Sequence, residues 1–200
     1  MKRAAVVSVF AVAVVVLAEH AVGQAVPAES QIVAASLAAP ADRREGATVL
    51  GYDATGKLVT LRRGANDLIC LADDPERDGF ETACYHESLE PFMARGRELT
   101  AAGVMGQDRI QTRYREAEAG TLKMPEQPAM LYILTGASFD AATGTVANEY
   151  RRSTIYIPYA TPESTGLSTQ ASETDPWIMF PGTPGAHIMI TPARVRSGSG

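Results

Sequence analysis

Apolar residues are most concentrated at the N-terminus, where two basic residues precede an almost unbroken apolar run from Ala4 to Ala18. A basic start, an apolar run of about fifteen residues and small residues at its end are typical of a removable secretory signal peptide. A membrane-spanning helix would need about twenty apolar residues, and Glu19 ends this run early. We therefore expect residues 1–25 to be a signal peptide, cleaved between Ala25 and Val26.

The next stretch, residues 26–46, is rich in alanine and contains Pro27, Pro40 and scattered charges. This composition favours a flexible leader, with a short helix around residues 30–37 as the alternative. The pattern then changes to one typical of strands. Residues 48–52 and 57–62 are two β-rich runs on either side of a short Asp/Gly turn, which predicts a hairpin, and a third short strand follows at 66–71.

Beyond residue 84 the apolar positions follow a helical period. Pro91 suits a first helical turn, where its missing N–H is harmless, and Gly103 suits a helix end. A second helix is expected over 108–119. Short apolar runs then predict strands at 129–135, 153–157 and 187–191. Residues 158–185, rich in Pro, Ser, Thr and Gly, predict a long irregular segment that is either functional or partly disordered.

Strands, then helices, then strands again predict an α+β domain with a mostly antiparallel sheet, an N-terminal hairpin and two central helices. The regular strand–helix alternation of a doubly wound parallel sheet is missing from this order. The length suits one domain over residues 47–192. We expect residues 193–200, which are polar and rich in Ser and Gly, to form a flexible tail.

Two cysteines, Cys70 and Cys84, are present in the chain. An even count in an exported chain predicts a disulfide. The bridge would close a loop of about fifteen residues and stabilise the fold by roughly 3 kcal/mol. A redox-active pair would favour close Cys-x-x-Cys spacing, which this pair does not have, so we expect a structural bridge.

The net charge of −5 at pH 7 is acidic. Such a surface disfavours nucleic acid, which binds through its phosphates, and anionic lipid. We therefore expect no nucleic-acid partner. No second apolar stretch approaches spanning length, so we also expect no stable membrane insertion after removal of the signal peptide. The expected location is exported, in the periplasm or outside the cell.

The acidic loop between the cysteines imitates the opening of a calcium-binding loop, with Asp74, Glu76 and Asp78 at alternate positions before a glycine. The imitation then fails. Glu81 stands where an apolar residue is expected, and Tyr85 stands where the bidentate Glu should be. A solvated surface loop is the favoured interpretation, and a weak divalent-metal site is the alternative.

Two histidines follow the expected signal peptide, His86 and His187. They could meet at a metal or form an acid/base pair, although neither has the spacing of a known motif. Trp177 and Phe180 lie in an apolar run within the irregular segment and are candidates for contact with a ligand or partner. Motifs for a nucleophilic serine, a phosphate-binding loop or a dinucleotide cofactor are missing, so we expect no cofactor.

Three patches of the sequence resemble a group of uncharacterised exported bacterial proteins. They are residues 58–66, the segment from Ile69 to Cys84, and Gly185–Ile190. The resemblance implies a secreted domain and supplies no catalytic residues. Taken together, the patterns favour an exported soluble domain that binds a protein or a small ligand. The alternatives are a hydrolase with a dispersed carboxylate/His site and a weak divalent-metal-binding protein.

Overall fold

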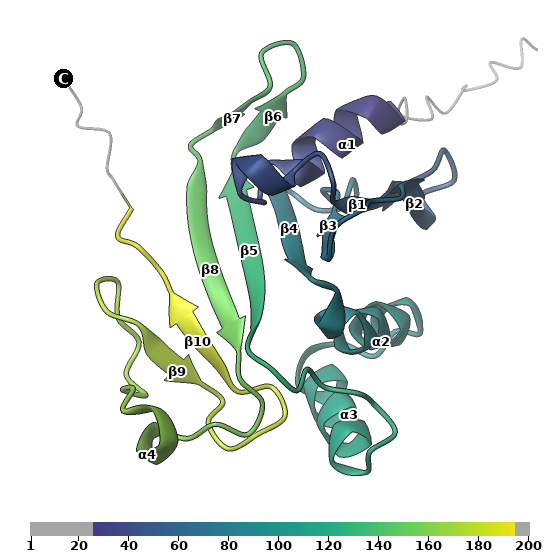
Figure 1. The fold of residues 1–200 in the computed structure, drawn as a ribbon. Helices are drawn as coiled ribbons and strands as arrows, with labels where there is room; N and C mark the ends of the chain where they lie inside the picture. Colours follow the sequence, from purple (N-terminus) through teal and green to yellow (C-terminus); the bar gives the residue numbers. More distant parts are fainter. Residues whose placement is uncertain (1–25, 195–200) are drawn as a thin grey trace, which may run out of the picture.

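The computed structural model describes residues 26–194, and Figure 1 shows the fold. Its main feature is an 8-stranded sheet with the strand order β2-β1-β3-β4-β5-β8-β10-β9. These strands are β1 (Thr48–Tyr52), β2 (Leu58–Arg62), β3 (Leu68–Leu71), β4 (Phe80–His86), β5 (Ala129–Gly136), β8 (Tyr150–Tyr156), β9 (Trp177–Met179) and β10 (His187–Ile190). A separate hairpin joins β6 (Ser138–Asp140) to β7 (Thr145–Ala147).

Neighbouring strands of the large sheet are antiparallel, with the single exception of β1 and β3 within residues 26–194. The expected α+β class with a mostly antiparallel sheet is therefore confirmed. β1 and β2 pair around the Asp/Gly turn, where Asp53 accepts hydrogen bonds from the backbone N–H groups of Thr55 and Lys57. β8 begins earlier than the sequence predicted, at Tyr150, because it pairs along almost the whole length of β5.

One face of the sheet is covered by α1 (Ala28–Ser36) and the short 3₁₀ helix η1 (Ala41–Arg43). In place of the favoured flexible leader, this part of the chain forms a helix close to the alternative expected around residues 30–37. Ala34, Ala35, Ala38 and Ala39 are buried in one cluster with residues of β1, β3, β4 and β5. Small side chains let the helix lie close to the sheet, and the proline before each helix occupies a position where its missing N–H is harmless.

The other face carries α2 (Glu90–Ala101) and α3 (Gly106–Glu118), close to the two expected helices. Successive residues of a strand point to opposite faces, so Cys84 faces α1 while Tyr85 faces the helix pair. Tyr85 and Leu89, from the 3₁₀ turn η2 (Glu87–Leu89), are buried together, and Phe92 of α2 packs with Tyr114 of α3.

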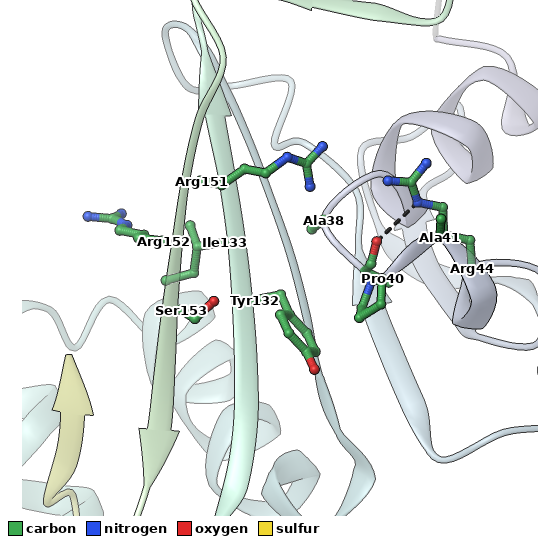
Figure 2. A pocket seen from close by; sticks show the side chains of 10 residues that line it. Ala38, Pro40, Ala41, Arg44, Tyr132, Ile133, Arg151, Arg152 and Ser153 are labelled. Carbon is green, nitrogen blue, oxygen red and sulfur yellow. Dashed lines mark hydrogen bonds between the residues drawn. The ribbon is translucent and has the colours of Figure 1, made fainter. Parts of the chain in front are cut away.

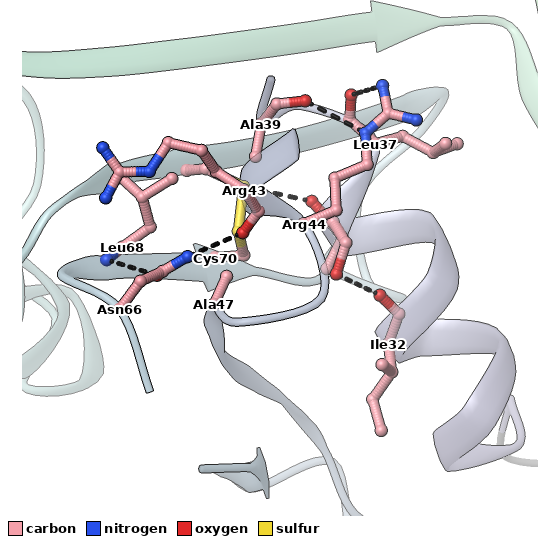
Figure 3. Close-up of a disulfide and its surroundings, with 12 residues drawn as sticks. Ile32, Leu37, Ala39, Arg43, Arg44, Ala47, Asn66, Leu68 and Cys70 are labelled. Carbon is pink, nitrogen blue, oxygen red and sulfur yellow. Dashed lines mark hydrogen bonds between the residues drawn. A yellow bond between two sulfur atoms is a disulfide. The ribbon is translucent and has the colours of Figure 1, made fainter. Parts of the chain in front are cut away.

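The predicted disulfide between Cys70 and Cys84 is present and fully buried. The two cysteines stand directly opposite each other on β3 and β4, beside the segment that follows α1 (Figure 3). The acidic residues between them lie in the loop that joins these strands. The bridge therefore links the antiparallel strands on which α1 packs.

The segment expected to be irregular, residues 158–185, contains two short elements. α4 (Pro162–Thr165) begins at Thr161, whose side chain caps it, and β9 pairs with β10. None of the helices between residues 26 and 194 is long and apolar enough to cross a membrane. The predicted signal peptide and most of the predicted tail lie outside the described residues.

Candidate ligand-binding site

A pocket of about 200 Å³ lies between the loop that follows α1 and the strands β5 and β8 (Figure 2). Ala38, Pro40 and Arg44 line it from the loop side, and Tyr132, Ser153 and Arg151 line it from the sheet. The small residues of the loop do not fill the space between the loop and the strands. The pocket therefore depends on how α1 is seated on the sheet.

Strand geometry decides which side chains reach the pocket. Tyr132 of β5 stands directly opposite Ser153 of β8, and Arg151 shares the face of Ser153 because it is two residues away along the strand. Arg152 lies between them in the sequence and points to the opposite side of the sheet (Figure 2). There its guanidinium lies 3.5 Å from a carboxylate oxygen of Glu81.

Two guanidinium groups converge on the end of α1. Arg44 donates from Nη2 to the Leu37 carbonyl oxygen at 3.2 Å and from Nε to the Ala39 carbonyl oxygen at 3.0 Å. Arg151 donates from Nη1 to the same Leu37 oxygen at 2.8 Å. The last carbonyl groups of a helix lack partners within the helix and attract cations. Neither arginine is among the site residues that the sequence predicts.

Three of the predicted contact residues lie on or next to β9 and β10. His187 is 8% exposed, and its ring centroid lies 5.0 Å from that of Tyr156 and 5.8 Å from that of Phe180. Phe180 itself is 42% exposed. The indole N–H of Trp177 is buried and has no hydrogen-bond partner within residues 26–194.

The fourth predicted residue, His86, does not join them. It ends β4, and strand alternation places it on the face opposite to His187. Its Nδ1 lies 2.8 Å from the Ser88 hydroxyl and accepts the backbone N–H of Ser88 at 3.2 Å, while its Nε2 lies 3.6 Å from an oxygen of Asp67. His86 thus caps η2, and the same contacts place a hydroxyl, an imidazole and a carboxylate in a row.

The acidic loop does not assemble a cation site. Asp74 accepts the backbone N–H of Glu76 at 3.0 Å, as in an ordinary tight turn. Over residues 26–194, no group of three or more His, Cys, Asp or Glu side chains is arranged to hold a metal ion. The candidate ligands Asp74, Glu76 and Asp78 therefore remain separate surface carboxylates.

Sequence reasoning identified His86 but missed Arg44, Arg151 and the two partners of His86, Asp67 and Ser88. The His-x-Ser spacing is a local signal that an N-cap search could find. The convergence of Arg44 and Arg151 has no local signal, since Leu37 and Arg151 are separated by 114 positions. Comparisons of the chain with protein-family models, curated proteins and solved structures found no match.

Proposed function

We propose that the protein is an exported domain that binds a small ligand in the pocket between the α1–η1 loop and strands β5 and β8. The N-terminal sequence and the disulfide support export, because disulfides persist in oxidising compartments. The observation that carries the binding proposal is the lining of the pocket. Apolar surface from Ala38, Pro40 and the Tyr132 ring meets a few polar groups, which is typical of ligand sites.

The size of the pocket limits the ligand. At about 200 Å³ it lies below the range of about 300–1,000 Å³ typical of sites for drug-sized molecules. A single aromatic ring or a short chain with one polar group suits this space. The hydroxyl of Ser153 and the guanidinium groups of Arg44 and Arg151 would orient it.

Chemical-shift mapping tests this proposal. Purified ¹⁵N-labelled protein is titrated separately with benzoate, benzyl alcohol and benzylamine, which share one ring and differ in charge. At least one probe is expected to shift amide signals of residues 38–44 and 151–153. Ser153→Phe, which fills the pocket, should abolish these shifts, whereas Ser138→Phe at an exposed position of β6 should not. Shifts confined to other regions, or no shifts with any probe, would overturn the proposal.

A second candidate function, hydrolysis of a small ester, is favoured by the contacts of Ser88. Nδ1 of His86 accepts the backbone N–H of Ser88, so the neutral ring carries its proton on Nε2. This nitrogen faces Asp67. This is the tautomer that a general base needs. Ser88 Oγ would attack the acyl carbon while its proton passes to His86. The alcohol would leave with that proton, and water would then release the acid.

A fluorophosphonate probe tests the second function directly. Intact-mass and peptide analysis should find one phosphonyl group on Ser88, lost in Ser88→Ala and in His86→Gln and kept in Ser172→Ala, a serine in a distant loop. Ser88→Ala and His86→Gln should also lose hydrolysis of p-nitrophenyl acetate, and Ser172→Ala should keep it. Absence of labelling in the folded protein would leave His86 with its capping role alone.

A further inference from the structure

The mouth of the pocket carries more positive than negative charge. Arg151 pairs with Glu149, whose carboxylate oxygen lies 2.5 Å from its Nε. Arg44 has no carboxylate within 4.0 Å in the part of the chain that the structure describes. Two guanidinium groups therefore face one carboxylate, on a chain whose net charge is −5. This local reversal of charge favours an anion at the site.

Both arginines keep guanidinium N–H donors that are unused within the described residues. Arg44 uses Nε and Nη2, and its Nη1 makes no hydrogen bond to residues 26–194. Arg151 uses Nε and Nη1, and its Nη2 makes no hydrogen bond to residues 26–194. The shared Leu37 carbonyl fixes the two groups side by side, which lowers the entropy lost when an anion accepts their remaining N–H groups.

We propose that the ligand of this pocket is a small organic anion with an apolar body, such as an aromatic or short-chain carboxylate. The inference rests on the proposed binding function and adds the charge of the ligand. Arg44 and Arg151 hold the anionic group, and the Tyr132 ring and Pro40 contact the apolar part. A planar carboxylate matches the two-pronged donor geometry of a guanidinium.

The experiment compares benzoate with benzyl alcohol, using the same shift titration at low and high salt. Benzoate is expected to bind at least about tenfold more tightly than benzyl alcohol. Hydrogen bonds to charged groups contribute more binding free energy than bonds between neutral groups, by an amount of that order. The affinity of benzoate should fall in 0.5 M NaCl, while that of benzyl alcohol should not. Arg151→Gln and Arg44→Gln should each remove most of the preference for benzoate. Arg115→Gln is the matched control, because this exposed arginine lies on α3, on the face of the sheet opposite to the pocket.

The outcomes separate the two proposals. Equal affinity for benzoate and benzyl alcohol, without salt dependence, overturns the inference about charge and leaves the binding function standing. Binding of none of the three ring probes overturns both. The comparison of probes and salt concentrations uses the unmodified protein, so it decides the question even if Arg44→Gln disturbs the end of α1. A preference for benzoate that persists in both arginine variants also overturns the inference.

Discussion

At the scale of single residues, His187 is a titratable side chain held among aromatic rings. Its ring packs against Tyr156 and Phe180, and its Nδ1 lies 2.7 Å from the carbonyl oxygen of Gly185. Burial disfavours the imidazolium and lowers the pKa of His187, while the hydrogen bond to Gly185 acts in the opposite direction. The neutral ring is therefore the form that the fold prefers.

The sign of the resulting pH effect follows from linkage. Above the ordinary histidine pKa of about 6.5 the ring is neutral in both the folded and unfolded states. As the pH falls below that value the unfolded state binds the proton first, so the free energy of unfolding decreases. Urea unfolding at pH 7.5 and pH 5.5 should show a smaller loss for His187→Gln than for the unmodified protein. Equal losses would contradict the effect.

At the scale of elements, the seating of α1 depends on one buried amide. Gln31 donates from Nε2 to the Tyr52 carbonyl oxygen and accepts the Tyr52 N–H at Oε1, both at 2.8 Å. The helix approaches β1 so closely that a Cβ on Gly51 would lie 2.6 Å from Oε1 of Gln31. The shape of the pocket depends on this arrangement, because the loop after α1 forms one of its walls.

Gln31→Ala should weaken the contact between α1 and β1. It removes both bonds and leaves backbone groups of Tyr52 without these partners, at an expected cost of about 1–3 kcal/mol. Chemical denaturation measures the change in the free energy of unfolding. Glu29→Ala, at an exposed position in the first turn of the same helix, is the control and should stay within about 0.5 kcal/mol. A negligible effect of Gln31→Ala would show that burial of the alanines alone seats the helix.

At the scale of the whole molecule, one sheet is covered on its two faces by different parts of the chain. α1 packs over β1 to β4, and α2 and α3 pack on the other face at the end of β4 and β5. The pocket lies where the α1 layer ends and β5 and β8 continue past it. The disulfide holds β3 to β4 beneath that layer.

Export of the whole chain can be tested by expressing it from Met1 in a Gram-negative bacterium. The mature product is expected outside the cytoplasm, with Val26 as its first residue, because the apolar run is too short for a stable anchor. N-terminal sequencing and intact mass identify the cleavage site, and thiol titration of the denatured, unreduced protein should find no free cysteine. A cytoplasmic product that retains Met1 would contradict the export proposal.

The sequence by itself determined the elements whose signals are local. The runs that became β5 and β10, the two helices α2 and α3, and the pairing of Cys70 with Cys84 follow from apolar periods, end signals and an even cysteine count. α1 had only a weak local signal, the alternative of a short helix around residues 30–37, because its alanines acquire their stabilising effect only when a sheet buries them. Composition therefore suggested a flexible leader where the chain forms a helix.

Only the tertiary structure decided the strand order, the faces of the sheet and the site. His86 and His187 looked like possible partners in the sequence, yet strand pairing separates them onto opposite faces. Arg44 and Arg151 belong to no motif of the sequence, yet they share one carbonyl at the end of α1. Such long-range contacts arise from the packing of α1 against strands far along the chain, and no pattern within a few neighbouring residues encodes them.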